Sequence, residues 1–578
     1  MKKTGGLLLV LVSCVHAQQP AGGRGSRPQQ PASPYPEQAR SVVMSRGGIV
    51  ASLQTLASQA GAAVLDRGGT AIDAAIAANA VLGVTEPLMN GIGGDLMAIV
   101  YDAKTKKLYG LNSSGWTPKG LTLEVLKAKG IAGKPSGRSI QVVTVPGAVA
   151  GWDVLHAKFG KLPMAELMQP AEYYAENGIP VAERIAVNWN ANGSRITDNP
   201  EFTKLFMPWG RPVKAGDTFV NKDLANSLRF IGEHGRDGFY KGPTAKALLD
   251  FSTEQGGTMV QADLDEFQPE WVEPISTTYR GWTVYELPPT GQGIAALSML
   301  NIMEQFPMSS YGQNSARALH TMIEAKKLAY ADLTKYVGDM RFYRAPLNEL
   351  LSKDLAAQRA KTIDADRAHC QVYPSEITAE LNAQGKDTTY LTVVDKDGNI
   401  ISLIQSLYGE FGTGLVVPGT GMILHNRGGL FDFAPGKVNS LGPRKRPQTT
   451  IIPAFMEKGD VKIGFGIMGG FNQAQAHAQF VSNIVDFGFN IQAAVEAPRF
   501  TKGTFDGCDV SIESRVSEPV RNQLTAWGHE LRVTEPISGT MGRGNAVMVD
   551  GNGLKYGASD PRGDGEAVPQ SPPIFSKR

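Results

Sequence analysis

Residues 387–395 constrain the fold of this chain more than any other segment, because their β-branched and aromatic side chains predict a β-strand that begins with a threonine. The polar residues just before the strand, 380–386, are expected to be exposed. A single cleavage between Asp387 and Thr388 would therefore leave Thr388 as a new N-terminus at the start of a sheet strand. An ordinary edge strand is the other interpretation of the same pattern.

A threonine at a chain terminus carries a nucleophile and a base on one residue, since its hydroxyl attacks a carbonyl while its α-amino group accepts the proton. That amine titrates at about pH 7.7–8.0, where a general base works best. The predicted strand is therefore a candidate for nucleophilic amide cleavage. The sequence contains no Gly-x-Ser-x-Gly elbow, so a triad of the α/β-hydrolase type has no support.

Short motifs in a fixed order extend the signal over most of the chain. They are Ala57–Gly61, Gly68–Ala75, Gly91–Gly94, Val145–Gly147, Ala329–Asp332, Thr388–Thr389, Phe411–Gly414, Met468–Gly470 and Gly557–Arg562. From about Ser41 to Arg562 the chain resembles the γ-glutamyltranspeptidase family of N-terminal nucleophile (Ntn) hydrolases. The resemblance implies an α+β fold, the four-layer αββα sandwich, in which one chain cleaves itself into two intertwined subunits, 41–387 and 388–578.

The resemblance assigns roles to the residues around the expected nucleophile. Thr388 would attack the Asp387 carbonyl during autocleavage and the substrate amide afterwards. Gly469 and Gly470, in a strand-to-helix turn, would direct backbone N–H groups at the oxyanion, because glycine lets the backbone approach a reacting carbonyl closely. Ser406 would place a hydroxyl beside the nucleophile, and a solvent-facing strand serine is the alternative for that residue.

The expected substrate site departs from the family pattern. Where the family has an arginine, an asparagine, a glutamine, an acidic residue and paired serines, this chain has Ser114, Tyr408, Arg427, Leu430, Thr449 and Thr450. No arginine lies near Ser114 in the sequence, and losing the paired charges should weaken recognition of a zwitterionic glutamyl group. Arg427 could instead bind a lone carboxylate bidentately, and Trp116 and Tyr408 could form an aromatic wall. This pattern resembles the divergent branch of the family that includes cephalosporin and glutaryl acylases.

The N-terminal residues predict export. Residues 1–17 have the charged, apolar and cleavage regions of a signal peptide, and 18–40 are a flexible linker rich in Pro, Gln and Gly. The protein is therefore expected to be periplasmic or secreted, and a lipobox-like sequence leaves a lipid anchor at Cys14 as the alternative. Cys370 and Cys508 could form a disulfide in an oxidising compartment or stay as two thiols.

Composition and spacing exclude several other classes of function. The net charge of +2 comes from 57 basic and 55 acidic residues, without a concentrated basic patch that would suit nucleic acid. The segment Pro288–Gly293 lacks the lysine of a phosphate-binding loop, so we interpret it as a turn. The eight histidines are scattered without metal-ligand spacing, so we expect neither a metal nor a cofactor.

Hydrophobic periodicity predicts the main elements. Helices are expected over Leu53–Asp66, Ala71–Leu82, Ala316–Tyr336 and Gln473–Phe487, and another begins at Pro146–Gly147. Strands are expected over Leu96–Tyr101, Lys107–Leu111, Thr389–Val394, Ile400–Gln405, Thr450–Met456, Val461–Ile467 and Asn545–Val549.

Together these features predict an exported, autoprocessing amidohydrolase that cleaves γ-glutamyl-like (glutathione-type) or glutaryl-type amides through an acyl-threonine intermediate, with hydrolysis favoured over transpeptidation. Its partners would be a small-molecule substrate and the two subunits of the same chain. The alternative is a catalytically silent member of the family that acts as a binding protein.

Overall fold

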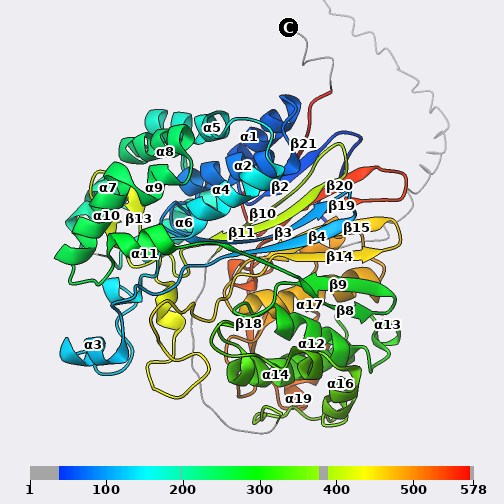
Figure 1. Cartoon of the computed structure of the whole chain (residues 1–578). Helices are drawn as coiled ribbons and strands as arrows, with labels where there is room; N and C mark the ends of the chain where they lie inside the picture. Colours follow the sequence, from blue (N-terminus) through cyan, green and yellow to red (C-terminus); the bar gives the residue numbers. More distant parts are fainter. Residues whose placement is uncertain (1–37, 197, 376–387, 573–578) are drawn as a thin grey trace, which may run out of the picture. The chain divides into compact units, whose positions relative to one another are not determined.

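The computed structural model describes residues 38–196, 198–375 and 388–572, and its core is a pair of seven-stranded sheets (Figure 1). Sheet A has the order β1 (Val43–Ser45), β20 (Lys555–Ser559), β19 (Gly544–Val549), β15 (Val461–Ile467), β14 (Ala454–Lys458), β9 (Trp282–Glu286) and β8 (Ile275–Tyr279). Sheet B has the order β21 (Glu566–Pro569), β2 (Ile49–Ser52), β10 (Thr389–Val394), β11 (Ile400–Ser406), β3 (Asp95–Asp102), β4 (Lys107–Ser113) and β7 (Glu270–Val272). Because β10 contacts both β15 and β19, the two sheets pack face to face.

Helices cover the outer faces of both sheets. Sheet B is covered by α1 (Thr55–Asp66), α2 (Ala71–Thr85) and α4 (Ala148–Phe159), with α5 (Met164–Asn177) packed on α2 and α8 (Lys222–His234) packed on α5. Sheet A is covered by α12 (Gly293–Met303), α17 (Asn472–Val485) and α18 (Ile491–Glu496), with α14 (Ala316–Tyr336) and α16 (Lys353–Ala360) packed on α12. The result is the expected α+β arrangement of four layers, αββα.

Shorter elements complete the described part of the chain. The helices are α3 (Leu123–Ala128), α6 (Glu183–Gly193), α7 (Pro200–Phe206), α9 (Asp237–Tyr240), α10 (Gly242–Glu254), α11 (Gln261–Glu266), α13 (Met308–Tyr311), α15 (Leu347–Leu350), α19 (Glu518–Ala526) and the 3₁₀ turns η1 (Ile140–Val142), η2 (Arg427–Leu430) and η3 (Gly539–Met541). The strands are β5 (Ile179–Pro180), β6 (Thr218–Phe219), β12 (Val416–Val417), β13 (Met422–Ile423), β16 (Phe500–Thr501), β17 (Asp509–Glu513) and β18 (Glu530–Thr534).

The strand that begins after Thr388 is central in its sheet rather than at an edge. β10 pairs with β2 on one side and with β11 on the other, and every residue of β10 and β11 is buried. Burial on both faces explains why both strands are apolar almost throughout. The edge-strand interpretation of residues 387–395 is therefore wrong.

The predicted elements are largely confirmed, with one clear error. The structure begins α1 at Thr55 instead of Leu53 and ends α17 at Val485 instead of Phe487. The strand predicted over Thr450–Met456 is wrong in its first half, because β14 begins only at Ala454. Pro453 has no N–H to donate to a strand ladder, so the residues before it stay outside the sheet.

Two groups of predictions fall on residues outside the described part of the chain. They concern the signal peptide, Cys14 and most of the linker within 1–37, and Asp387 with the polar segment before it within 376–387. Among the residues that the structure does describe, no helix has both the length and the apolar character needed to cross a membrane.

Candidate active site

Thr388 lies immediately before β10 and is fully buried. Its Oγ1 lies 3.2 Å from Oγ of Ser406, the last residue of the neighbouring strand β11. The backbone N–H of Tyr408 donates a hydrogen bond of 2.7 Å to the same Ser406 oxygen. Strand pairing and this hydrogen bond therefore hold a second hydroxyl beside the threonine.

The packing of the two sheets sets which part of sheet A faces Thr388. Two close approaches show how β10 lies against β15. Gly466 of β15 leaves room for the Tyr390 ring of β10, and Gly464 of β15 leaves room for Thr392 Oγ1 of β10. The two strands therefore run in opposite directions across the interface. Each step of two residues toward the N-terminus of β10 corresponds to a step of two residues toward the C-terminus of β15. Extending this pairing from Tyr390 and Gly466 by one step matches Thr388 with Met468, which precedes Gly469.

The turn between β15 and α17 has the backbone conformation that requires glycine. Gly469 has φ 133° and Gly470 has φ 60°, values that other residues rarely adopt. The N–H of Asn472 donates to Gly469 O at 3.0 Å, and the N–H of Gln473 donates to Gly470 O at 3.2 Å. Within the described residues, no backbone carbonyl accepts from the N–H groups of the two glycines, so these donors are available for an oxyanion.

Arg427, the first residue of η2, is fully buried and is held by Asp95 through two hydrogen bonds. Its Nε lies 2.8 Å from Asp95 Oδ2 and its Nη2 lies 3.0 Å from Asp95 Oδ1. Its Nη1 donates to Thr450 Oγ1 at 2.8 Å, and its guanidinium carbon lies 4.9 Å from the centre of the Tyr408 ring. The bidentate face with which Arg427 was expected to bind a substrate carboxylate is therefore occupied by Asp95.

Ser114 and Trp116 lie in a different set of contacts. The Ser114 carbonyl accepts a hydrogen bond of 2.8 Å from Arg446 Nε, so folding brings an arginine to a loop that has none nearby in the sequence. The indole of Trp116 packs edge-on against Phe267, with ring centres 5.2 Å apart. Three guanidinium groups lie within 5.7 Å of its ring: Arg341, Arg444 and Arg446. Trp116 therefore packs against Phe267 and cations, whereas Tyr408 packs against Arg427.

Several buried polar atoms on the segments that meet at Thr388 have no hydrogen-bond partner among the described residues. They are Thr389 Oγ1, Thr449 Oγ1, Gln473 Nε2 and Asn545 Oδ1. Leaving one such atom unpaired costs about 1–3 kcal/mol, and native proteins tolerate few of them. Hydroxyl and amide groups in this state are suited to contact a polar ligand.

Two residues to which the sequence analysis gave no role hold the site together. Asp95 is the first residue of β3, lies in register with Ser406 and binds Arg427. Gln292 precedes α12, and its Nε2 donates to Thr450 O and to Gly470 O, both at 2.7 Å. The signal for Asp95 was a carboxylate at the start of an apolar strand, because a buried charge needs a partner. The signal for Gln292 was the Pro288–Gly293 motif, which we interpreted only as a turn.

A cavity of about 320 Å³ opens beside the same segments. Its wall includes Leu430 of η2, Gln448 and Phe471. Gln448 precedes Thr449 in the sequence, and Phe471 follows Gly470. The rest of the wall is mostly apolar, with an exposed lysine at the rim: Phe431, Phe433, Ala434, Phe505 and Lys134. Asp432, also in the wall, lies 3.3 Å from Lys437 and is paired with it.

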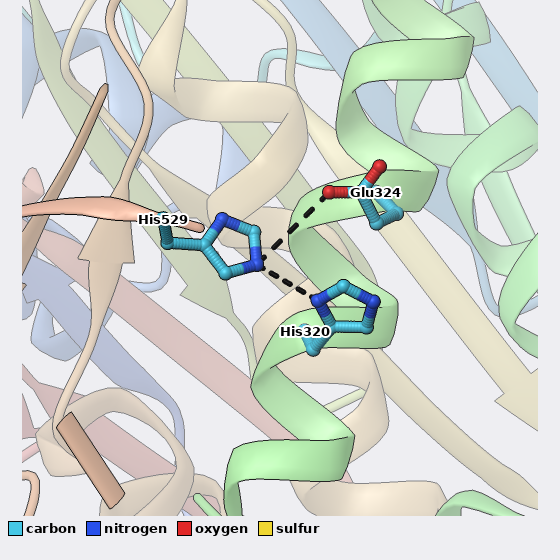
Figure 2. Close-up of side chains that lie close together, drawn as sticks. All are labelled: His320, Glu324 and His529. Carbon is cyan, nitrogen blue, oxygen red and sulfur yellow. Dashed lines mark hydrogen bonds and ion pairs between the residues drawn. The ribbon is translucent and has the colours of Figure 1, made fainter. Parts of the chain in front are cut away.

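A second polar cluster lies in another part of the described chain, where His320 and Glu324 of α14 face His529 (Figure 2). His320 Nε2 lies 2.8 Å from Asp364 O, which can only accept, so that nitrogen carries the proton. His320 Nδ1 lies 2.8 Å from His529 Nε2 and accepts from it. Desolvation lowers the pKa of His320 and lowers that of His529 to about 3, so both rings are neutral. Lys327 Nζ lies 2.5 Å from Glu324 Oε1 and neutralises that carboxylate.

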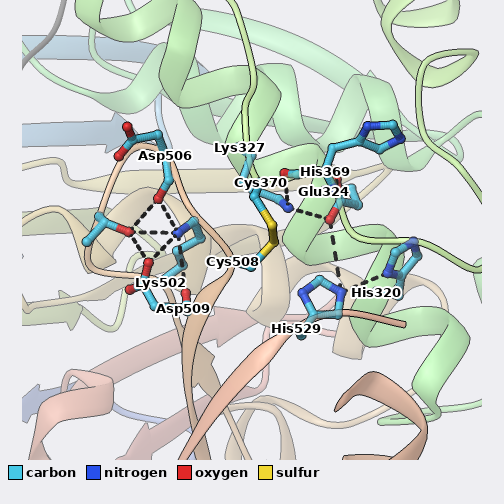
Figure 3. The surroundings of a disulfide bond; sticks show 11 residues. His320, Glu324, Lys327, His369, Cys370, Lys502, Asp506, Cys508, Asp509 and His529 are labelled. Atoms are coloured by element: carbon cyan, nitrogen blue, oxygen red, sulfur yellow. Dashed lines mark hydrogen bonds and ion pairs between the residues drawn. A yellow bond between two sulfur atoms is a disulfide. The ribbon is translucent and has the colours of Figure 1, made fainter. Parts of the chain in front are cut away.

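The disulfide Cys370–Cys508 lies beside this cluster (Figure 3). The sequence left the pairing of the two cysteines open, and the structure pairs them. Lys327 Nζ reaches the carbonyl of His369 at 2.6 Å, which ties the cluster to the chain at Cys370. Beyond the disulfide, Lys502 Nζ is buried and donates to Asp509 Oδ1 at 2.9 Å. Cys370 precedes Thr388 and Cys508 follows it, so this bond joins the two sides of the chain.

Comparisons with known proteins identify the family of this chain. The sequence profile of the family described as Gamma-glutamyltranspeptidase matches residues 57–570. The chain is 36% identical over 524 residues to the glutathione hydrolase-like YwrD proenzyme of Bacillus subtilis (strain 168), which covers 90% of this chain and 98% of that protein. It is 34% identical over 531 residues to the Acylase ACY 1 proenzyme of Pseudomonas sp. (strain SE83), over 90% of this chain and 93% of that protein.

Solved structures give the same answer for the fold. The crystal structure of cephalosporin acylase from Bacillus halodurans superposes with a TM-score of 0.86 and 39% sequence identity, over 94% of this chain and 99% of that one. The match therefore includes both sheets and all four layers. Together with the profile, it shows that the chain belongs to the gamma-glutamyltranspeptidase family, whose members are Ntn hydrolases that act on amide bonds.

Proposed function

We propose that this protein is an exported, self-cleaving amidohydrolase in which Thr388 is the nucleophile. The observation that carries the proposal is the position of Thr388 at the start of a central strand, with its Oγ1 3.2 Å from Ser406 Oγ. The register of β10 against β15, extended by one pair, puts the Gly469–Gly470 turn beside it. Both a second hydroxyl and backbone donors then lie where an acyl-transfer reaction needs them.

Maturation would use the same hydroxyl as turnover. Thr388 Oγ1 attacks the Asp387 carbonyl carbon, the C–N bond to Thr388 breaks, and its nitrogen takes a proton to become the free amine. Water then hydrolyses the resulting ester, which releases a carboxylate at Asp387 and restores the Thr388 hydroxyl. Ser406 would orient and polarise that hydroxyl in both reactions, since its oxygen is itself held by the Tyr408 N–H.

In the mature enzyme the Thr388 amine would accept the hydroxyl proton as Oγ1 attacks the substrate carbonyl. The negative charge that develops on the carbonyl oxygen would be stabilised by the N–H groups of Gly469 and Gly470. The amine then returns the proton to the leaving nitrogen, and water resolves the acyl-threonine. We place hydrolysis above transfer to an amine.

The substrate we favour is an amide whose acyl group ends in a carboxylate and carries no α-amine, as in a glutaryl group. Leu430 provides no anion for an ammonium, and the wall of the cavity beside it is mostly apolar, with its carboxylate, Asp432, already paired with Lys437. Because Arg427 is paired with Asp95, the cation that we favour for the terminal carboxylate is Lys134 at the rim of the cavity. The acylases among the relatives support this choice, whereas the glutathione hydrolases support a γ-glutamyl substrate.

The test is a denaturing gel under reducing conditions combined with kinetics. The purified protein should run as two bands from a cut before Thr388, and Thr388→Ala should give one full-length band without activity. Matched anilides should then be hydrolysed with a higher kcat/KM for glutaryl than for γ-glutamyl. A Thr388→Ala chain that still splits at this bond would exclude Thr388 as the nucleophile. An uncleaved, inactive wild-type protein would favour the silent, ligand-binding alternative.

Export is proposed on two grounds. The sequence of 1–17 has the features of a signal peptide, and a disulfide such as Cys370–Cys508 persists in an oxidising compartment. Fractionation of cells should find the two-chain form outside the cytoplasm, and the same protein recovered only from the cytoplasm would contradict the proposal. Labelling with a radioactive fatty acid would distinguish a lipid anchor at Cys14 from simple cleavage.

A further inference from the structure

We propose that Gln292 is a positioning residue that holds the oxyanion turn against the Thr449–Thr450 segment, an inference that rests on the function proposed above. Gln292 is fully buried and precedes α12. It belongs to the part of the chain before Thr388, whereas both segments that it contacts follow Thr388. No other described side chain donates one amide nitrogen to both the Thr450 and the Gly470 carbonyl.

The geometry of the Gln292 amide is defined on every side. Nε2 donates to Thr450 O and to Gly470 O, both at 2.7 Å, and thus uses both of its hydrogens. Oε1 lies 3.3 Å from the Tyr330 hydroxyl, whose single proton is directed mainly at Phe471 O, the closer of the two acceptors. Thr450 O and Gly470 O can only accept, so these two carbonyls fix which end of the amide carries the nitrogen.

The backbone beside Gln292 supports the same two segments. Thr290 O accepts a hydrogen bond of 3.0 Å from the Thr449 N–H, and Gly291 forms a bridge with Thr449. On the opposite side, Gln473 Oε1 accepts from the Ile452 N–H at 3.1 Å. The segment that carries Thr449 is therefore clamped between residues 290–292 and α17. Among the described side chains, Gln292 is the one on the 290–292 side that ties this clamp directly to the Gly469–Gly470 turn.

This contact matters for the reaction because of where the Gly470 carbonyl would otherwise point. The turn has positive φ at both glycines, and glycine peptides in this region have little steric resistance to rotation. Without Gln292, the hydrogen bond of 3.2 Å from the Gln473 N–H is the one that Gly470 O keeps among the described residues. A rotated turn would move the Gly469 and Gly470 N–H groups away from the substrate carbonyl, and it would bring a carbonyl oxygen toward a developing negative charge.

The experiment replaces Gln292 by methionine, which has a similar length but no donor, and compares it with Gln479→Met. Gln479 is a matched control, because it is also buried and its Nε2 also donates to two carbonyls, those of Gln475 and Phe500, outside the site. Removing an oxyanion donor itself costs about 10²–10³-fold in kcat, so we expect loss of its support in Gln292→Met to cost about 10–100-fold. KM for glutaryl-anilide should change by less than about threefold. Gln479→Met should keep the wild-type kcat at a similar loss of thermal stability.

A second readout separates positioning of the turn from general loosening of the fold. A boronic acid analogue of the glutaryl group forms a tetrahedral adduct with the Thr388 hydroxyl, whereas glutarate binds without one. In Gln292→Met the inhibition constant of the boronic acid should rise in parallel with the fall in kcat/KM, while that of glutarate stays unchanged. Both inhibition constants should be unchanged in Gln479→Met.

The inference is overturned if Gln292→Met keeps the wild-type kcat, or if Gln292→Met and Gln479→Met lose kcat equally at equal loss of stability. It is also overturned if the affinities for glutarate and for the boronic acid fall together, since that would indicate a distorted binding pocket. Failure of the proposed function has a different signature, because the wild-type protein would then be uncleaved or inactive before any variant is compared.

Discussion

The polar groups around Thr388 and those around the Cys370–Cys508 disulfide are both buried, and both join residues before Thr388 to residues after it. They differ in how their polar atoms are paired. Around Thr388 most groups are neutral hydroxyls and amides, and several have no described partner. Around the disulfide the charges are matched, as in Lys327 with Glu324 and Lys502 with Asp509, and His529 Nδ1 is a polar atom there without a described hydrogen-bond partner. The first arrangement is suited to receive a ligand, and the second is suited to hold the chain together.

The largest expected effect tests the free amine at the first of these regions. Adding one residue before Thr388 in a separately produced small subunit should lower turnover by about 10²–10⁴-fold, the usual contribution of a general base. The extension turns the basic amine into an amide while the hydroxyl remains. The measurement is kcat on glutaryl-anilide, beside a small subunit that begins at Thr388.

The same pair of proteins gives the pH dependence. With the unextended chain, activity should rise through about pH 7–8 as the amine loses its proton, because only the neutral amine accepts one. An extended chain with full activity, or a rise in activity that starts far below this range, would show that another group is the base. The region around Thr388 would then be a binding site only.

The second effect tests the Arg427–Asp95 ion pair in the Thr388 region. Arg427→Met should lower the free energy of unfolding by about 3–5 kcal/mol, because it leaves Asp95 buried without its partner. Asp95→Asn should have a similar effect, and the double variant should lose less than the sum. Urea unfolding of the variants checks both. Arg138→Met is the control, since its pair with Asp198 is exposed and such pairs contribute at most about 1 kcal/mol.

The result for Arg427 also decides between a structural and a substrate-binding role. If Arg427→Met keeps wild-type stability and only raises KM for glutaryl-anilide, Arg427 binds the substrate carboxylate as the sequence suggested. The structural role assigned by the Asp95 contact would then be wrong. Lys134→Met should raise that KM without loss of stability, because Lys134 lies at the exposed rim of the cavity.

The sequence predicted the parts of these two regions that depend on neighbouring residues, and it missed the contacts between residues that are far apart along the chain. The strand after Thr388 and the Gly469–Gly470 turn were predictable because their signals are local: a run of β-branched and aromatic residues, and adjacent glycines. The partner of Arg427 was not, since Asp95 lies far away along the chain and meets Arg427 only through the pairing of β3 with β11. The His320–His529 contact was missed for the same reason, because two histidines without motif spacing meet only when α14 packs against α19 and the residues that follow it.

The third effect tests the covalent link of the second region. If the chain is cut before Thr388, Cys370–Cys508 should keep both products in one band on a non-reducing gel and release two bands on reduction. Cys508→Ser should give two bands in both gels and lose about 2–4 kcal/mol of stability, the usual contribution of a disulfide. Its unfolding midpoint should also depend on protein concentration, because the two chains then separate.

A mature wild-type enzyme that runs as two bands without reductant would show that the cysteines are unpaired. The matched charges around Cys370 would then hold the two chains together without a covalent bond. A Cys508→Ala variant with the same behaviour as Cys508→Ser would confirm that the effect comes from the lost disulfide rather than from the introduced hydroxyl.

The fourth effect is a pH dependence of stability from the histidines of the second region. Desolvation lowers the pKa of His529 to about 3 from the model-peptide value of 6.5. Between these values the unfolded chain binds a proton that the folded chain does not, so stability falls as pH drops below 6.5. His529→Gln should flatten the fall in melting temperature between pH 7 and pH 5, whereas His234→Gln, on the exposed surface, should leave it unchanged. An unchanged slope in His529→Gln would place the acid sensitivity elsewhere.

The smallest expected effect is that of a metal chelator, and it tests whether the second region is structural. The ligand atoms of His320, Glu324 and His529 lie within 4.8 Å of one another, which is close enough for an ion. A divalent cation there would, however, lie against the buried ammonium of Lys327, which already neutralises Glu324 at 2.5 Å. It would also have to displace the proton that His529 shares with His320 Nδ1. EDTA should therefore leave the melting temperature and the activity unchanged, and elemental analysis should find no stoichiometric zinc.

Lys327→Met removes the opposing charge, so zinc that raises the melting temperature of this variant but not of the wild type would show that the lysine occupies the place of a cation. Zinc bound to the wild-type protein, or a melting temperature lowered by EDTA, would show that His320, Glu324 and His529 form a metal site and that this region is not purely structural.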